Sequence, residues 1–330
     1  DEVFAKRGIE TIDDLIAYVE KWYGTEDRGN FKSPKNALNK FVAYHIIEGE
    51  YPVNLILPQG EVYDKHLGKW YPRFDYFETK LGKLMKIVKP YGTQDAANIY
   101  INHSKREIPY NPEMRHHLNV RLIETTEFTQ ANVTQNNFVP NAINGTIQPI
   151  DKILIYNENE MVGNILNERM RFDMSTLIPE LQCNKMRYYA PQNHFLYFLG
   201  ENFSKNVKFH TSRPLLYRPG VDTYLGDFMG TDRGLDCSFK LPNVPPRTYE
   251  IRLANQLGFI QTYIDGKVTG IPIDGSTFEA AEIGYVPDEE TEDNGVENDK
   301  QMRNRGWMKA PDSFYGYLYN TYVPARKTKS

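Results

Sequence analysis

The spacing of apolar residues changes along this chain, and that change constrains the fold more than any other feature. From residue 11 to residue 23, apolar side chains recur every three or four positions, which is the period of an amphipathic helix. Thr11 can cap this helix with Asp14 in the capping-box position, and Gly24 lies in the polar turn that ends it. The predicted apolar stripe consists of Ile12, Leu15, Ile16, Val19, Trp22 and Tyr23.

A second helix is predicted from Ser33-Pro34, with serine as its cap and proline at its first position. Its apolar face is expected to contain Leu38, Phe41, Val42 and His45. His45 would then point where a core residue points. A neutral imidazole has one donor and one acceptor and can bridge two elements. A structural role for His45 is therefore favoured over a role as ligand or proton carrier.

Short β-type segments replace the helical pattern further along the chain. They cover residues 98–101, 119–123 and 146–156, and polar turns separate them. Asn144-Gly145 is a turn signal directly before the last of them. Helices followed by strands predict an α+β domain over residues 1–156.

Residues 157–205 are predicted to form a helical connector that packs between two domains. This segment has no Gly/Ser-rich or Pro-rich run of the kind that makes a flexible linker. Its apolar residues recur at helical spacing. They are Met161, Val162, Ile165, Leu166 and Met170.

The last part of the chain has the period of two that is typical of half-buried strands. Tyr249, Ile251 and Leu253 fall on one face of a strand, and Asp265-Gly266 is a hairpin signal further on. Several short strands at this spacing predict an antiparallel β-sandwich of the jelly-roll type over residues 206–330.

Composition excludes some classes of partner. The chain has 39 basic and 43 acidic residues, so it carries no basic field that would attract nucleic acid. No run approaches the roughly 18 apolar residues of a membrane-spanning helix, so we expect no transmembrane segment. Cys183 and Cys237 could form one disulfide, but two unpaired thiols are favoured because the two are far apart.

Catalytic and metal-binding patterns are weak. His116-His117 are adjacent in a predicted polar loop, and adjacent side chains diverge in an extended segment, so a shared metal is disfavoured. The acidic run 288–300 lacks the last glutamate of a calcium loop and is predicted to be a solvated loop. Carboxylates for glycoside hydrolysis are available, but none lies in a recognisable motif. We expect no enzyme activity, no metal and no cofactor.

An aromatic segment near the C-terminus is the candidate ligand-binding surface. If residues 307–322 are extended, alternate tyrosines share one face and can stack on sugar rings. The candidate ligand-binding residues are Trp307, Tyr315 and Tyr317. The alternative is an ordinary core strand whose rings face inward.

Two separated motifs give the first 156 residues a resemblance to fasciclin-like domains. One is the Tyr44-His45 pair, and the other is a late box from Asn144 to Leu154 that includes Gly145 and Asp151. The family often has histidine where this chain has Gln148. The resemblance implies a structural role for Tyr44, His45, Asn144, Gly145 and Asp151. It also implies an extracellular adhesion or interaction module without catalysis.

Later segments resemble fasciclin-domain proteins of the Bacteroides group, which are secreted or held on the cell envelope as lipoproteins. These segments are ERMRFDMSTLIPEL, IDGKVTGIPID and DKQMRNRGWMKAP. The resemblance implies a cell-surface location, with membrane anchoring only through an N-terminal lipid anchor lost before Asp1.

The expected function is therefore non-catalytic binding of a glycan or a cell-surface protein. The alternative is a structural or assembly subunit of an envelope complex that binds no small molecule. A glycoside hydrolase ranks third.

Overall fold

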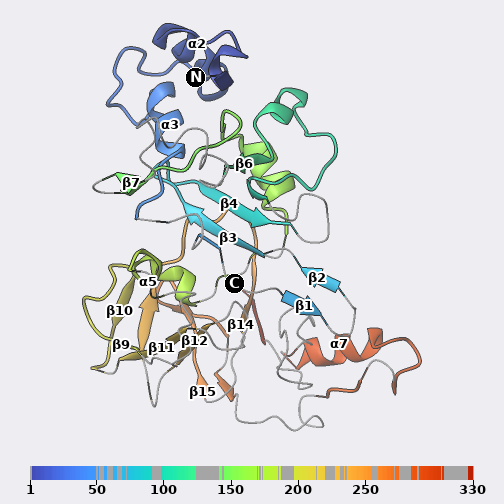
Figure 1. Cartoon of the computed structure of the whole chain (residues 1–330). Coiled ribbons are helices and arrows are strands. Elements are labelled where there is room, and N and C mark those ends of the chain that lie inside the picture. Colours follow the sequence, from blue (N-terminus) through green and yellow to red (C-terminus); the bar gives the residue numbers. More distant parts are fainter. Residues whose placement is uncertain are drawn as a thin grey trace. The chain divides into compact units, whose positions relative to one another are not determined.

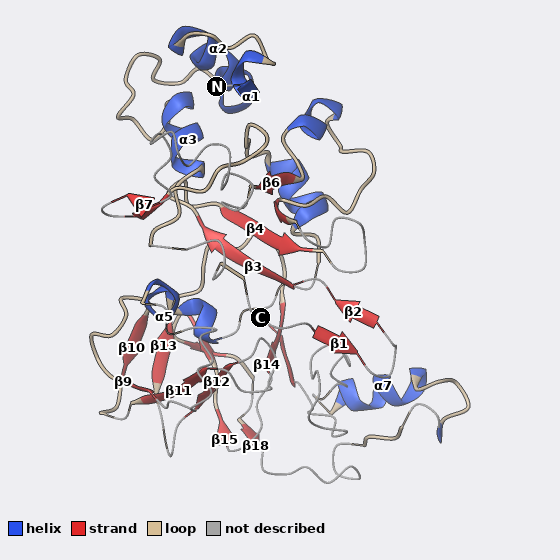
Figure 2. Cartoon of the chain, in the orientation of Figure 1, coloured by secondary structure: helices blue, strands red, loops and turns tan. Residues whose placement is uncertain are grey.

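The computed structural model combines helices with antiparallel sheets, so the chain is a mixed α+β protein (Figure 2). It divides into two compact units, Asp1–Tyr63 with Lys69–Pro245, and Asp64–Gly68 with Pro246–Ser330. The predicted domain boundaries after residues 156 and 205 stay predictions. The structure describes residues 2–49, 51, 56–57, 62–64, 69–71, 73–90, 98–123, 141–142, 145–168, 170, 172, 174–184, 186, 197–212, 214–219, 227–230, 234, 236–253, 259–270, 272–274, 284–287, 290–305, 307 and 326–329.

The first unit begins with three helices, α1 (Glu2–Ala5), α2 (Ile12–Tyr23) and α3 (Ala37–Tyr44) (Figure 1). The predicted limits of α2 are confirmed. Thr11 accepts a hydrogen bond from the Asp14 N–H, and the Asp14 carboxylate accepts one from the Thr11 N–H, which is the complete capping box. Gly24 ends the helix at φ 83°, in the left-handed region that favours glycine.

Thr11→Ala is expected to lower the free energy of unfolding by about 1 kcal/mol, because α2 then loses the side-chain half of its capping box. Thr11→Ser is the matched control, since serine keeps the hydroxyl acceptor. Urea unfolding of both variants measures the difference. An equal loss in the two variants would contradict a capping origin.

The predicted start of α3 is wrong, and its predicted apolar face is right for Leu38 and Phe41 but wrong for Val42 and His45. Asn36 is the N-cap in place of Ser33, and its side chain accepts hydrogen bonds from the N–H groups of Leu38 and Asn39. The buried face contains Ala37, Phe41 and Tyr44. His45 is exposed and lies just beyond the helix as its C-cap, so it does not face the core.

A four-stranded antiparallel sheet forms the centre of this unit. Its order is β3 (Arg73–Glu78), β4 (Leu84–Lys89), β5 (Ile99–Ile101) and β6 (Val120–Leu122). The last two strands confirm the predictions for 98–101 and 119–123. Two further two-stranded sheets are β1 (Val62–Asp64) with β2 (Lys69–Tyr71), and β7 (Asn141–Ala142) with β8 (Gly145–Thr146).

The predicted strand 146–156 is wrong over most of its length. Beyond β8, its pairing is an isolated bridge between Ile150 and Leu122. Ile153, Leu154 and Ile155 are nevertheless all buried. Ile153 and Ile155 belong to one hydrophobic cluster and Leu154 to another, so this segment lies between two parts of the core without being a strand.

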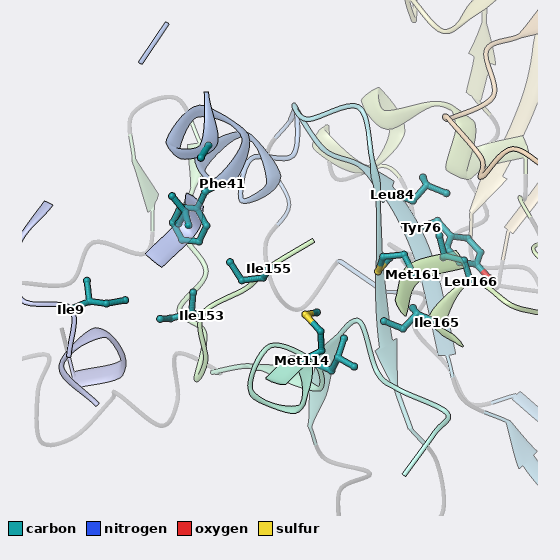
Figure 3. Close-up of a cluster of buried hydrophobic side chains, with 13 residues drawn as sticks. Ile9, Phe41, Tyr76, Leu84, Met114, Ile153, Ile155, Met161, Ile165 and Leu166 are labelled. Atoms are coloured by element: carbon teal, nitrogen blue, oxygen red, sulfur yellow. The ribbon is translucent and has the colours of Figure 1, made fainter. Parts of the chain in front are cut away.

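The largest hydrophobic cluster joins residues that are far apart in sequence (Figure 3). Val19 of α2 and Phe41 of α3 share it with Leu84 of the sheet and with Met161 and Ile165. The last two residues both come from the π-helical turn η4 (Met161–Ile165), which directly follows α4 (Glu158–Glu160). The predicted helical stripe of this segment thus packs into the same core as α2.

The rest of the first unit is built around a third cluster. Its buried members are Ile178, Leu181, Leu199, Leu215 and Tyr217. They come from or adjoin η5 (Met174–Leu177), α5 (Pro179–Cys183), and the sheet of β9 (Tyr197–Leu199), β11 (Leu215–Pro219) and β12 (Asp227–Gly230). β10 (Val207–Phe209) pairs with β13 (Cys237–Phe239). Cys183 and Cys237 are not joined in a disulfide, as expected, and burial raises the pKa of the Cys237 thiol to about 11.

Where it is described, the second unit contains short strand pairs and one helix. The pairs are β14 (Glu250–Leu253) with β19 (Arg326–Lys329), β15 (Phe259–Ile260) with β18 (Ile273–Asp274), and β16 (Tyr263–Ile264) with β17 (Lys267–Val268). The last pair confirms the predicted hairpin, with Asp265 at φ 49° and Gly266 at φ 75°. α7 (Val296–Asn304) begins inside the acidic run 288–300, so the loop prediction is wrong there. Within the described residues, no helix has the length and apolarity to cross a bilayer.

Candidate recognition site

The residues predicted to bind ligand are only partly described. Trp307 is half-buried, and its N–H donates to the Met302 carbonyl at 2.8 Å, at the end of α7. Tyr315 and Tyr317 lie outside the described residues. The predicted aromatic surface therefore stays a prediction.

Tyr44 of the fasciclin-like motif is fully buried. Its hydroxyl donates to the Leu84 carbonyl at 3.2 Å and accepts from the Asn102 side-chain amide at 2.8 Å. Burial raises the pKa of Tyr44 far above its usual value. Asn102 is itself fully buried at φ 51°, and its Oδ1 accepts from the Lys86 N–H. Tyr44 thus ties α3 to the sheet.

The other motif residues have local contacts. The exposed His45 ring donates from Nδ1 to the Phe41 carbonyl at 2.8 Å. Gly145 lies in β8, and the Asp151 carboxylate accepts from the Arg121 N–H at 2.7 Å. Asn144 lies outside the described residues.

His117 occupies the bridging position that sequence reasoning gave to His45. It is buried; its Nδ1 donates to the Ile153 carbonyl at 2.8 Å, and its Nε2 lies 2.9 Å from the Tyr18 hydroxyl. Because a carbonyl can only accept, the neutral ring carries its proton on Nδ1 and accepts from Tyr18. The burial of His117 has one signal in the sequence, which is its helical spacing from Met114 and its position beside Leu118. These residues lie in η2 (Pro112–His116) and just beyond it. Metal ligands do not cluster here: the described residues contain no group of three His, Cys, Asp or Glu side chains placed to hold a metal ion.

Glu168 is the centre of a largely buried charged cluster. Its carboxylate accepts from Lys86 at 2.6 Å and also pairs with Lys105 and with the Tyr76 hydroxyl. Burial acts to raise the pKa of Glu168, but Lys86 and the hydrogen bonds outweigh it and hold that pKa below its usual value. The Lys86 side chain is only 6% exposed, and its ammonium lies 4.6 Å from the centroid of Phe74.

A second buried carboxylate, Glu160, anchors the loop Ser104–Asn111, which we name the recognition loop. Glu160 has no exposed surface, and its two oxygens accept from the Asn111 N–H at 2.8 Å and the Asn164 amide at 3.2 Å. The Asn164 amide also donates to the Ser104 hydroxyl at 2.8 Å, and its Oδ1 accepts from the Lys105 N–H at 3.1 Å. Both ends of the recognition loop are therefore fixed to α4 and η4 by satisfied, buried groups.

Tyr110, next to the end of the recognition loop, is held by its side chain as well. The Tyr110 hydroxyl donates to the Gly163 carbonyl at 3.3 Å. A Cβ at Gly163 would lie 2.8 Å from the Tyr110 ring, so only glycine admits the ring at this distance. The close approach of the Tyr110 ring thus explains why position 163 of the π-helical turn is a glycine.

The recognition loop displays three large side chains on the surface. Arg106 lies over the Tyr110 ring, 4.0 Å from its centroid, and its Nε donates to the Ile108 carbonyl at 3.2 Å. Ile108 and Tyr110 are 63% and 52% exposed. An arginine, an isoleucine and a tyrosine are thus held in fixed positions in contact with water.

The hairpin β16–β17 of the second unit is another exposed apolar feature. Tyr263 and Val268 face each other across the strands and are both exposed. One residue further from the turn, the hydroxyls of Thr262 and Thr269 lie 2.5 Å apart, and the Thr269 N–H donates to the Thr262 carbonyl. The base of the hairpin is therefore fixed while its apolar side chains remain in water.

Comparison with known proteins gives no relative: no family model, no curated protein and no solved structure matches this chain.

Proposed function

We propose that this chain is a non-catalytic binding protein of the cell surface that contacts a protein partner through the recognition loop. The observation that carries the proposal is the loop itself. Two buried residues, Glu160 and Asn164, hold its backbone, while Arg106, Ile108 and Tyr110 are displayed to solvent.

The composition and rigidity of the loop support a role in protein recognition. Arginine and tyrosine are enriched among the residues that carry most of the binding energy in protein interfaces. A loop that is already ordered loses less conformational entropy when it binds. An exposed isoleucine beside them adds apolar area that a partner can bury.

A protein partner is favoured over a glycan at this loop. Sugars stack on open aromatic faces, but the Arg106 guanidinium lies over the Tyr110 ring, and the edge of that ring contacts Gly163. Arg106 therefore already occupies a position over the ring that a flat sugar contact would need.

Two largely buried carboxylates, Glu168 and Glu160, also support a non-catalytic function. A general acid needs a raised pKa, whereas the pKa of Glu168 is lowered by its lysine partners. Both oxygens of Glu160 accept hydrogen bonds from the recognition loop and Asn164. These groups serve structure in the proposed function.

The finer architecture belongs to the same proposal. We take residues 1–156 as a fasciclin-like domain and residues 206–330 as a β-sandwich, on a lipid-anchored envelope protein. The burial of Tyr44 supports the structural role that the family resemblance gives it. Assembly into an envelope complex is a second candidate, which the exposed Tyr263–Val268 pair favours.

Site-specific photo-crosslinking tests the proposed function. A benzophenone amino acid replaces Ile108, and a matched variant carries it at Phe31, which is 50% exposed and outside the loop. Both proteins are irradiated with the envelope fraction of the producing cells, and the adducts are identified by mass spectrometry. We expect one dominant protein adduct from position 108 and none of that protein from position 31.

Two outcomes would reject the proposal. One is the absence of a dominant adduct from position 108, and the other is the same set of adducts from both positions. If the double variant Arg106→Ala with Tyr110→Ala still binds a glycan array, recognition takes place at another surface.

A further inference from the structure

We infer that Arg106 is a carboxylate-binding residue, and that the recognition loop takes an acidic protein segment in which an aspartate or glutamate lies beside an apolar side chain. This inference rests on the proposed function and names the chemistry of the partner.

The guanidinium of Arg106 is held in place by two contacts that do not involve its terminal amino groups. It stacks on Tyr110 at 4.0 Å, and its Nε donates to the Ile108 carbonyl at 3.2 Å. Among the described residues, its two terminal amino groups have no hydrogen-bonding or ionic partner. Two adjacent N–H groups in one plane match the two oxygens of a carboxylate, and a fork already held in place loses little side-chain entropy on binding.

Of the two cations in the recognition loop, Arg106 is the one that can bind an anion. The Lys105 ammonium, one residue away, is paired with Glu168. Glu107 is exposed and carries a negative charge beside Arg106. One unpaired cation next to an acidic residue suits a singly charged carboxylate better than a phosphate, because a phosphate carries close to two negative charges.

Ile108 supplies the apolar half of the site. It is 63% exposed, and its own carbonyl accepts from Arg106, so the apolar side chain and the guanidinium lie within one short segment. A partner that presents a carboxylate next to a leucine or valine can satisfy both at once. A lone anion without apolar surface would contact the guanidinium and leave Ile108 in water.

A peptide microarray tests this chemistry directly. Nine-residue peptides carry Leu-Asp or Leu-Glu at their centre, and matched sets carry Leu-Asn, Leu-Gln or Leu-phosphoserine. We expect the wild-type protein to bind the Asp and Glu sets. Arg106→Ala is expected to weaken this binding roughly 10- to 100-fold, as for loss of a hydrogen-bonded charge pair. Arg106→Lys should restore part of it.

Two further variants sharpen the test. Arg115→Ala removes another exposed arginine and should leave binding unchanged. Glu107→Gln should strengthen binding, because it removes the neighbouring negative charge. Equal binding of the acid and amide sets, preference for phosphoserine, or full binding by Arg106→Ala would each overturn the carboxylate inference. If the crosslinked adduct from position 108 is still found in any of these cases, the proposed function is retained and only the carboxylate inference is rejected.

Discussion

Glu168→Leu is expected to lower the free energy of unfolding by about 3 kcal/mol, the lower end of the effect of breaking a buried ion pair. The substitution removes the carboxylate that pairs with Lys86, whose side chain is only 6% exposed. It also removes an acceptor from Tyr76 and Lys105. Urea unfolding at pH 7 measures the loss.

Two controls separate the buried charge from a general effect of substitution. The double variant Lys86→Met with Glu168→Leu should recover most of the stability, because both charges of the buried pair are then removed together. Glu158→Gln breaks the Lys83–Glu158 pair, whose side chains are 43% and 47% exposed, and should change stability by less than about 1 kcal/mol. A double variant as unstable as Glu168→Leu would contradict the explanation.

The same cluster predicts sensitivity to acid. The pKa of Glu168 is lower in the folded protein than its usual value of 4.5. Its contribution to stability is therefore complete above that usual value and is lost as the pH falls through the folded pKa. Glu168→Leu should lose this part of the acid dependence.

Two local signals were read correctly from the sequence, although the Ser33-Pro34 cap signal was not. The capping box of Thr11 and Asp14 lies within four residues, and the Asp265-Gly266 hairpin depends on two residues that accept positive φ. Each is decided by neighbours along the chain. Predictions of this kind succeeded because no distant contact can easily override them.

Non-local burial explains what the sequence did not predict. The segment 151–156 has the apolar run of a strand, but clusters on both of its sides bury it, so it needs no sheet partner. The recognition loop depends on Asn164, which is 59 residues from Lys105 in the chain. No spacing rule connects residues so far apart. His117 was missed for the same reason, since Tyr18 lies 99 residues before it.

The bridging role that was predicted for His45 is filled by His117. His45 follows the last turn of α3 and is exposed, whereas Tyr44 takes the buried position one residue earlier. A helical stripe with two adjacent candidates, Phe41-Val42 and Tyr44-His45, fits two orientations about 100° apart. Burial of the larger aromatic rings selected one of them.

His117→Leu is the second substitution with a large expected effect. It leaves the Ile153 carbonyl without its side-chain donor and removes the acceptor of the Tyr18 hydroxyl. It also removes the ring contact with Trp22, whose centroid is 5.0 Å away. We expect a loss of about 2–3 kcal/mol in the free energy of unfolding at pH 7.5, from an unsatisfied buried group and a lost bridge between α2 and the core.

The pH dependence distinguishes this bridge from simple packing. Burial lowers the pKa of His117 below its usual 6.5, the Ile153 carbonyl opposes this, and Arg7 and His116 add to it. The fold thus prefers the neutral ring, and the contribution is complete above pH 6.5 and is lost as the pH falls through the folded pKa. The slope from this one proton is at most about 1.4 kcal/mol per pH unit.

Urea unfolding at pH 7.5, 6 and 5 should therefore show a gap between wild type and His117→Leu that narrows in acid. His116→Leu is the matched control for the size of the loss at pH 7.5, because the exposed His116 should contribute little to the free energy of unfolding. Nitrogen chemical shifts of the wild-type ring should show the proton on Nδ1 at pH 7.5. A proton on Nε2, or a gap that does not change with pH, would mean that His117 contributes by packing and that α2 is held by its apolar stripe alone.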